Sequence, residues 1–357
     1  MLYCETVPVS KRMWTLKNTI IWMFRTELGC FILLKIKLFS MSDEKVFVSV
    51  IMPSYNAEEY VGEAIESILN QSYEDFELII VDDLSTDGTY SRIKQFKDDR
   101  IITVRNNENK GIAFSTNRGI NMSKGKYIAL IDDDDIAYPY RLKKQIEYME
   151  ENESIDILGG NSEIIDAQGN HIRYGKVPHN NPKYLKAMLL FKTVDFINDT
   201  AMIRSDFLRK YELRYKEKYC GMQDYRFFMD ASKIGNISSI DNYIMKYRIH
   251  DHNYTDKCKQ NYSTMRKRLY SQIRKDSLTR SGYMIADQHY GFLDAVLQED
   301  YDGCINKHML DNLYCVFVEI LKQAVQMEVD YFEELNLFLK RLYTDKLYRT
   351  DLFNVYD

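Results

Sequence analysis

The 357-residue sequence is poor in proline and has no paired-cysteine motif. Its five prolines argue against long disordered linkers. The six cysteines are scattered, with no CxxC pair and no secretory signal, so neither a zinc ribbon nor a disulfide framework is indicated. We therefore expect a globular protein of the reducing cytoplasm.

The sequence also lacks a basic charge excess and a long uncharged apolar run. Its formal net charge is -5, whereas duplex-binding proteins are more often basic, so no nucleic-acid partner is expected. Residues 19–39 are apolar, but they contain no uncharged run of the roughly 18 residues that span a bilayer. The interrupting charges are Arg25, Glu27, Lys35 and Lys37.

Residues 1–44 differ from the rest of the chain, and we interpret them as an N-terminal extension. Three interpretations stay open: a basic amphipathic helix on an anionic surface, a helix packed on the domain, or residues upstream of a true start at Met41. The last is favoured, because residues 41–45 are a polar lead-in of the kind that precedes a first strand.

From Phe47 onward, apolar runs alternate with amphipathic stretches of about ten residues. Strands are expected at residues 47–52, where Pro53 should end the first one, and at 77–81, 101–104 and 127–131. Strands that alternate with helices predict βαβ units and a parallel sheet covered on both faces. We place this domain at residues 45–255. Helical patterns at 262–273 and 310–325 then predict a helical C-terminal region over residues 256–357.

Three of the predicted strands end in polar residues: SYN (54–56), DD (82–83) and DDDD (132–135). Ligands bind beyond the carboxyl ends of the strands in such sheets, so these residues should line one edge. No GxGxxG or GxxxxGK[ST] follows the first strand, which disfavours dinucleotide and P-loop phosphate sites.

Four consecutive carboxylates repel one another, and burying an unpaired carboxylate is costly. A divalent metal is the natural counter-ion. Oxygen ligands favour Mg²⁺ or Mn²⁺, whose open positions a diphosphate can fill. The alternative is a solvated acidic turn before a helix, since Asp also caps helices well.

Several segments, in order along the chain, resemble the motifs of the family 2 glycosyltransferases. They are VSVIMPSYN (48–56), IVDDLSTDGT (80–89), NKG to NRG (109–119), IDDDD (131–135) with Pro139, Leu142 and Gln145 behind it, QDYRFF (223–228) and YRIHDHN (247–253). The resemblance implies the GT-A fold: a Rossmann-like α/β domain with a mixed, mainly parallel sheet flanked by helices.

The resemblance also implies roles for individual residues. The expected metal is Mn²⁺ or Mg²⁺, with Asp134, Asp135 and His250 as candidate ligands. Four identical residues leave the register open, so the sequence does not decide which of Asp134 and Asp135 touches the metal. The residues expected to hold the nucleotide-sugar are Pro53, Tyr55, Asn56, Asp82, Asp83, Lys110, Asp132 and Asp133.

Asp224 matches the general base of the family, which deprotonates the acceptor hydroxyl. Gln223 stands where the family commonly has Glu. The alternative is that Asp224 only caps its helix, whose Phe227 and Phe228 face the core. Asp199 lies in a segment, 198–204, that we interpret as a strand near the acceptor cleft.

The resemblance thus implies a metal-dependent inverting glycosyltransferase. It would move one sugar from a nucleotide-sugar, expected to be a UDP-sugar, to a glycan or lipid-linked acceptor in cell-surface polysaccharide synthesis. The alternatives are a nucleotide-sugar hydrolase and a catalytically silent nucleotide-binding module. QIRK (272–275) is not the Gln-x-x-Arg-Trp signature of processive synthases, which disfavours chain extension.

Location and assembly are less constrained by the sequence. Basic residues in 257–275 either attract anionic phospholipid, which gives peripheral contact at the inner face of the membrane, or belong to helices packed on the domain. The sequence indicates no oligomeric state.

Overall fold

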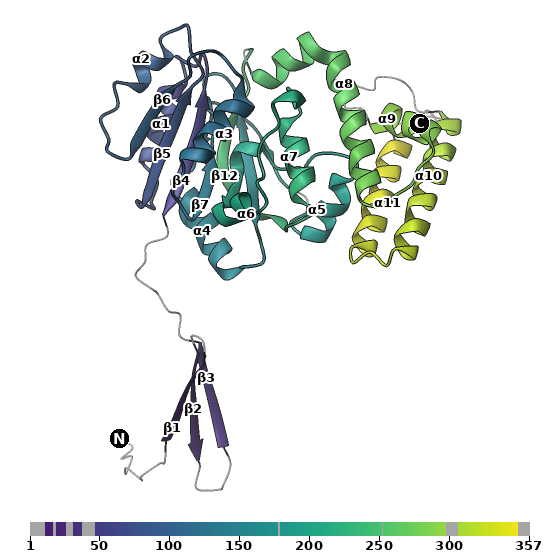
Figure 1. Cartoon of the computed structure of the whole chain (residues 1–357), viewed down its shortest axis with the longest axis horizontal. Helices are drawn as coiled ribbons and strands as arrows, with labels where there is room; N and C mark the ends of the chain where they lie inside the picture. Colours follow the sequence, from purple (N-terminus) through teal and green to yellow (C-terminus); the bar gives the residue numbers. More distant parts are fainter. Residues whose placement is uncertain are drawn as a thin grey trace. The chain divides into compact units, whose positions relative to one another are not determined.

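The computed structural model describes residues 11–16, 19–25, 31–37, 47–177, 179–251, 253–297 and 306–348. The chain divides into two compact units, residues 1–45 and residues 46–357. Figure 1 shows the elements of each.

The first unit contains three strands, β1 (Lys11–Leu16), β2 (Thr19–Arg25) and β3 (Phe31–Lys37). They form an antiparallel sheet in the order β1-β2-β3. The helical interpretations of residues 19–39 are therefore wrong for the described segments 19–25 and 31–37. These segments, TIIWMFR and FILLKIK, are rich in the β-branched and aromatic residues that favour strands. The lead-in at 41–45 lies outside the described residues.

The second unit is built on a nine-stranded sheet with the order β6-β5-β4-β7-β11-β9-β12-β8, and β10 also pairs with β9. The first four of these strands are mutually parallel. β11 runs antiparallel to both β7 and β9, and β12 is parallel to β9. The sheet is therefore mixed, as predicted. The strands are β4 (Val48–Ser54), β5 (Phe76–Asp82), β6 (Ile101–Arg105), β7 (Tyr127–Leu130), β8 (Ile136–Ala137), β9 (Ile157–Ile165), β10 (His171–Gly175), β11 (Met202–Arg204) and β12 (Ile237–Arg248).

The strands predicted at 47–52, 77–81, 101–104 and 127–131 are confirmed as β4 to β7, with one error at an end. β4 runs through Pro53 to Ser54 and does not stop at Pro53. Its pairing with β7 ends at Ile51, so the missing N–H of Pro53 faces no strand on that side. The strand expected at 198–204 is also only partly correct, because residues 198–200 form the 3₁₀ turn η1 (Asn198–Thr200).

Helices cover both faces of the sheet, and successive residues of β4 show it. Val50 belongs to a buried cluster with Ile65 of α1 (Val61–Leu69), while Ile51 belongs to a second cluster with Ile120 of α3 (Ile112–Met122). A Cβ on Gly119 would lie 2.5 Å from Ile51, so this glycine lets α3 pack closely on β4. The remaining helices of this part are α2 (Thr89–Ile93), α4 (Arg141–Glu151), α5 (Pro182–Leu189), α6 (Ser205–Lys210), the 3₁₀ turn η2 (Glu217–Tyr219) and α7 (Gln223–Ala231).

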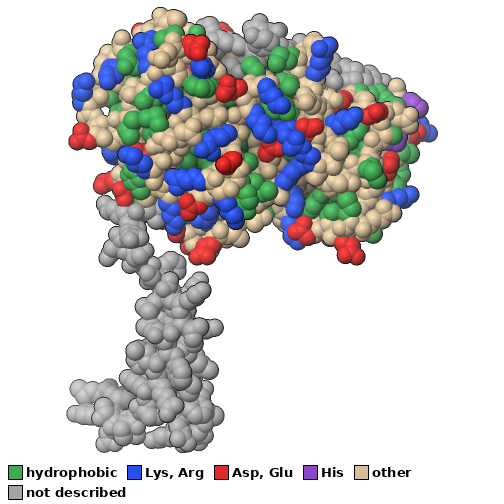
Figure 2. All heavy atoms as spheres, viewed as in Figure 1, with side chains coloured by type: hydrophobic (Ala, Val, Ile, Leu, Met, Phe, Trp, Pro, Cys, Tyr) green, Lys and Arg blue, Asp and Glu red, His purple; other side chains and the backbone are tan. Residues whose placement is uncertain are grey.

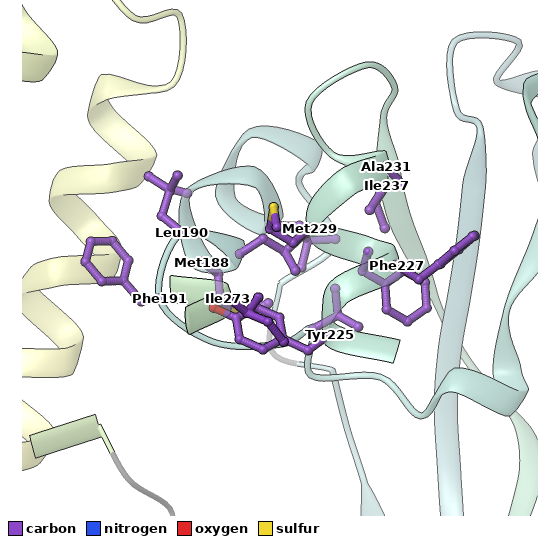
Figure 3. Packing of buried hydrophobic residues seen from close by; sticks show 14 of the residues in the cluster. Met188, Leu190, Phe191, Tyr225, Phe227, Met229, Ala231, Ile237 and Ile273 are labelled. Atoms are coloured by element: carbon purple, nitrogen blue, oxygen red, sulfur yellow. The ribbon is translucent and has the colours of Figure 1, made fainter. Parts of the chain in front are cut away.

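The C-terminal helices share a hydrophobic core with the sheet domain. Phe191 stacks on Phe338, with ring centroids 5.5 Å apart, and meets Phe317 edge-on at 6.3 Å. Figure 3 shows Phe191, Tyr225 and Ile273 among the buried residues of this cluster. The helices are α8 (Tyr254–Arg280), α9 (Asp287–Leu297), α10 (Lys307–Gln326) and α11 (Phe332–Tyr348), so the helices predicted at 262–273 and 310–325 are confirmed. A domain boundary at residue 255 remains a prediction.

None of the helices in the described ranges is both long and apolar enough to cross a membrane. Figure 2 shows lysine and arginine side chains spread over the visible face of the second unit, among acidic side chains.

Candidate active site

A cavity of about 1180 Å³ opens beyond the carboxyl ends of β4, β5 and β7. Both halves of the second unit contribute to it. Asp83 follows β5, the acidic run follows β7, and Asp224 lies at the start of α7. Most of the predicted site residues line this one cavity: Pro53, Tyr55, Asn56, Asp83, Asp132, Asp133, Asp134, Asp224 and His250.

Two residues expected to bind the nucleotide are placed elsewhere. The Asp82 carboxylate is fully buried and pairs with Arg105 Nε at 2.8 Å, so its position corresponds to a structural role. Lys110 Nζ pairs with Glu108 at 2.9 Å, and the Lys110 side chain does not line the cavity. Its backbone N–H, however, contributes to the site by donating to Asp83 Oδ1 at 3.0 Å.

Asp83 is held by three donors. Asn106 Nδ2 donates to Oδ1 at 2.6 Å, and the backbone N–H of Gly111 donates to Oδ2 at 2.7 Å, besides the Lys110 N–H. Gly111 has φ 85°, a conformation that glycine adopts without strain. Leu84, with φ 60°, does not have that freedom, and such strained residues are concentrated at functional sites.

The structure separates Asp134 from Asp135, which the sequence could not. Asp134 faces the cavity, where its Oδ2 lies 2.9 Å from His250 Nε2. Asp135 is fully buried and its Oδ1 accepts from the backbone N–H of Arg248 at 2.9 Å. Arg248 Nε also donates to the Asp134 carbonyl at 2.8 Å, so Arg248 fixes the backbone of the acidic run. Asp135 does not line the cavity, whereas its buried Oδ2 has no hydrogen-bond partner among the described residues, and its role as a metal ligand stays a prediction.

Burial and mutual repulsion hold the acids of the run in a strained electrostatic state. Burial, and then the neighbouring Asp134 charge, raises the pKa of Asp133 to about 7. Burial also raises the pKa of Asp199, to about 6, although its hydrogen bond with Asp132 acts in the opposite direction. The pKa of Asp132 is raised well above its ordinary value by burial and by the charge of Asp199. A bound cation would relieve this repulsion.

Arg141 of α4 is a buried cation beside these acids. It is fully buried, and its Nη2 donates to the carbonyls of Leu130 at 2.6 Å and Asp199 at 2.7 Å. Burial lowers the pKa of Arg141 to about 10, against the opposing effect of Asp199 and Asp135. Arg141 thus ties the end of β7 to η1.

Asp224 lies in the first turn of α7, whose N-cap residue is Met222 and has no capping side-chain bond. Its Oδ1 accepts from the Tyr225 N–H at 2.7 Å. Asp224 is therefore not the N-cap residue of its helix. It lines the cavity from the first turn of α7, whereas Asp83 and Asp134 follow strands. A carboxylate in this place can take a proton from a hydroxyl bound in the cavity.

A model of the glycosyl transferase family 2 matches residues 49–212. An uncharacterized glycosyltransferase of Haemophilus influenzae is 33% identical over 242 residues, which are 65% of this chain and 73% of that protein. The chain belongs to the family 2 glycosyltransferases. A second relative, the glucosyltransferase WfgD of Escherichia coli, is 33% identical over 197 residues, 54% of this chain and 73% of WfgD. Its name states a UDP-Glc donor and an α-D-GlcNAc-diphosphoundecaprenol acceptor.

Solved structures show the fold of this family 2 glycosyltransferase. S. aureus TarS 1-349, in complex with UDP-GlcNAc, aligns with a TM-score of 0.55 at 16% identity, over 84% of this chain and 91% of TarS 1-349. The mannosyltransferase PcManGT from Pyrobaculum calidifontis, in complex with GDP-Man and Mn²⁺, aligns with a TM-score of 0.51 at 14% identity, over 84% and 86% of the two chains. The predicted GT-A fold is confirmed.

The residues around Asp134 fit a divalent metal in their chemistry. Asp134 offers a carboxylate oxygen, His250 an imidazole nitrogen, and the buried Asp135 Oδ2 has no hydrogen-bond partner in the described part of the chain. No group of three or more His, Cys, Asp or Glu side chains among the described residues is arranged to hold an ion. A Mg²⁺ site can have few protein ligands, because the ion takes further oxygens from water and from substrate phosphates.

Sequence reasoning missed several residues that shape the site. The sequence contains one weak indication that Arg141 belongs to the site, which is its position two residues beyond Pro139 of the acidic motif. Asp199 was placed only in a segment near the acceptor cleft. Arg173 of β10 and Arg266 of α8 also line the cavity of this glycosyltransferase, and no motif marks them.

Proposed function

We propose that this family 2 glycosyltransferase is metal-dependent and inverting, and that it moves one sugar from a UDP-sugar to a glycan or lipid-linked acceptor. One observation carries the proposal. Asp83, Asp134 and Asp224, from three separate stretches of chain, line a single cavity. Each has the chemistry of one step: base recognition, metal binding and proton removal.

Asp83 is suited to recognise the uracil base. Its carboxylate is 3% exposed and already fixed by three donors, so it presents its remaining acceptor capacity in one direction. The imide N–H of uracil is a donor that matches it. The UDP-Glc donor named for WfgD and the UDP-GlcNAc complex of TarS support uridine.

Asp134 and His250 would hold Mn²⁺ or Mg²⁺. When bound, this ion neutralises charge that develops on the leaving nucleoside diphosphate. Asp133 has a separate task, because its Oδ2 accepts from the backbone N–H of Tyr55 at 2.9 Å and so ties the acidic run to the turn after β4. Asp132 and Asn56 line the cavity beside these residues and would contact the ribose and diphosphate.

The Asp224 carboxylate acts as the base. The acceptor oxygen forms a bond to C1 of the donor sugar while its proton passes to Asp224. The bond between C1 and the diphosphate oxygen breaks with its electron pair on the nucleoside diphosphate. Attack from the face opposite the leaving group inverts the configuration at C1, and only one protein carboxylate is needed.

A lipid-linked acceptor would keep the enzyme at the inner face of the membrane, in the cytoplasm. Lys267 and Arg268 of α8 are exposed and could contact anionic headgroups. The acceptor named for WfgD is lipid-linked and supports this part of the proposal, together with a role in cell-surface polysaccharide synthesis.

The test is a donor screen that measures nucleoside diphosphate release from UDP-glucose, UDP-GlcNAc and GDP-mannose, with Mn²⁺, with and without a synthetic α-GlcNAc-diphosphate lipid. Release that depends on the acceptor, with a new glycosidic bond, is the expected result. Release that never depends on the acceptor would indicate a nucleotide-sugar hydrolase. UDP binding without turnover would indicate a silent binding module. Asp224→Asn should keep UDP affinity and lose transfer, and unchanged turnover would remove Asp224 from the mechanism.

A further inference from the structure

Three buried oxygens that belong to residues lining the cavity have no hydrogen-bond partner in the described ranges. They are Ser54 Oγ, at the end of β4 on the donor side, and Thr193 Oγ1 and Gln223 Oε1. Burying a polar atom without a partner is unfavourable, and nearly all such atoms in native proteins are satisfied by protein, water or ligand. Oxygens of this kind in an active-site cavity therefore indicate where a ligand forms hydrogen bonds.

The positions of Thr193 and Gln223 assign their oxygens to the acceptor. Gln223 is the first residue of α7 and directly precedes Asp224. Thr193 lies in the segment between α5 and η1. Neither belongs to the strand ends that carry Asp83 and Asp134. A ligand group beside Gln223 is next to the hydroxyl that Asp224 deprotonates.

The chemistry of the surrounding wall narrows the ligand class. Val194 and Met222, which adjoin the two residues in sequence, and Phe196, three residues after Thr193, line the cavity with apolar surface and are 6%, 2% and 5% exposed. Apolar surface with a few placed polar groups is typical of small-ligand sites, and a sugar ring presents both C–H faces and hydroxyl edges.

The hydrogen-bonding roles of the two oxygens narrow the ligand class further. Gln223 Oε1 can only accept a hydrogen bond, and Asp224 beside it also accepts, whereas the Thr193 hydroxyl can do either. The matching ligand groups are hydroxyls or an amide N–H. A carboxylate or phosphate at this point would face two acceptors and be repelled.

We propose that Thr193 and Gln223 form an acceptor subsite that takes an uncharged sugar through hydroxyl or amide groups beside the reacting hydroxyl. The inference rests on the proposed function and names the substrate class of its acceptor side. Both are positioning residues, while Asp224 is the group that touches the reacting oxygen.

The kinetic test uses Gln223→Met and Thr193→Val in the full chain, because each removes the oxygen and nearly keeps the volume. With UDP-glucose, Mn²⁺ and the synthetic α-GlcNAc-diphosphate lipid, the acceptor KM should rise about tenfold or more in each variant, as expected when a hydrogen bond to a substrate group is lost. The UDP dissociation constant should stay within about twofold, since the donor side is untouched. An unchanged acceptor KM, or an equal loss of UDP affinity, would overturn the proposal.

Two further variants separate positioning from folding. Gln223→Glu keeps an accepting oxygen and should keep the acceptor KM close to that of the parent chain. Tyr225→Phe, two residues further along α7, removes a hydroxyl that is also buried and has no hydrogen-bond partner among the described residues, but Tyr225 does not line the cavity. It should leave transfer unchanged. A Tyr225→Phe effect as large as that of Gln223→Met would show that the loss comes from α7 packing.

A binding measurement tests the inference independently of transfer. If the parent chain transfers no sugar to this lipid, that result counts against the proposed function alone. The protein is labelled with ¹³C-methyl methionine and loaded with UDP and Mg²⁺, and the Met222 signal is assigned with Met222→Leu. N-acetylglucosamine, glucose or galactose at millimolar concentration should shift the Met222 signal, and the shift should be lost in Gln223→Leu. No shift with any of the three, or an equal shift with glucuronate, would overturn the inference.

Discussion

His250 Nε2 lies 2.9 Å from Asp134 Oδ2, although the two residues are 116 positions apart in the chain. The contact joins the segment after β12 to the acidic run after β7. Asn253 Nδ2 also donates to the same Asp134 oxygen, at 3.3 Å, and Asn253 Oδ1 accepts from the His250 N–H at 2.6 Å. One carboxylate oxygen thus lies within hydrogen-bond distance of an imidazole nitrogen and an amide nitrogen, and these contacts fix the Asp134 side chain at the cavity.

Substitution of Asp134 and Asp135 should separate the metal ligand from its structural neighbour. Asp134→Asn removes the charged oxygen at the cavity, so the gain in UDP affinity on adding Mn²⁺ should fall by more than the roughly 10- to 100-fold typical of outer-sphere partners. Asp135→Asn retains an oxygen that can accept from Arg248, so the Mn²⁺ effect should persist. Calorimetric titration of UDP with and without Mn²⁺ measures both. The reverse pattern would assign the metal to Asp135.

Substitutions of the neighbouring residues Asp82 and Asp83 should likewise have different effects on UDP affinity. Asp83→Asn replaces one carboxylate oxygen with an amide NH₂ group, which would face the N–H groups that donate to Asp83. Hydrogen bonds to charged groups contribute about 1.5–3 kcal/mol. UDP affinity should fall accordingly, because the side chain would no longer present its oxygens in one direction. Asp82→Asn loses an ion pair with Arg105 outside the cavity and should leave UDP affinity unchanged. If Asp82→Asn weakened UDP binding as much as Asp83→Asn, the assignment of Asp83 would be wrong.

These pairs show what the sequence could and could not predict. The strands were readable because apolar runs of four to seven residues alternate with helical stripes, and their polar ends follow from the rule for parallel sheets. The direction in which each acidic side chain points could not be predicted from the sequence. Adjacent residues at a strand end point to opposite sides, so Asp82 meets Arg105 while Asp83 meets the cavity. Which of the two acids faces the cavity depends on their partners, and these partners are distant in the sequence.

The second half of the site was predictable only at its motifs. Asp224 and His250 stood in recognisable segments, and both line the cavity. Thr193 and Arg266 lie in a loop and a helix without any motif, and their place depends on how α5 and α8 pack on the sheet domain. The N-terminal strands were missed because charged residues within an apolar segment suggested an amphipathic helix.

Lys233 gives a pH prediction away from the metal site. Burial, and then the Arg280 charge, lowers the pKa of Lys233 to about 8. Between about pH 8 and 10.4 the unfolded chain therefore binds more protons than the folded one, so stability should rise with pH across that window. At pH 7 the charged, half-buried ammonium costs about 1–2 kcal/mol after allowance for solvent screening.

Lys233→Met should therefore stabilise the protein at pH 7 and flatten the rise in stability above pH 8. Urea unfolding at several pH values measures both effects. Ile234→Lys, at the next and exposed position, should leave the pH dependence as it is in the parent chain. Loss of stability in Lys233→Met at pH 7 would mean that its contact with the Ser277 carbonyl, at 3.4 Å, outweighs the burial of the charge.

Arg141 should prove the most sensitive of the structural residues around the site. Arg141→Met leaves the carbonyls of Leu130 and Asp199 without their donor and removes the buried cation beside the acidic run. Breaking such a buried charged contact typically costs about 3–5 kcal/mol. Lys143→Met, on an exposed position of the same helix, is the matched control and should change stability by less than about 0.5 kcal/mol. Urea unfolding compares the two. Because η1 would lose its tie to β7, we also expect Arg141→Met to weaken Mn²⁺-dependent UDP binding under conditions where the variant is still folded. A variant with normal UDP affinity would show that the acidic run keeps its geometry without the arginine.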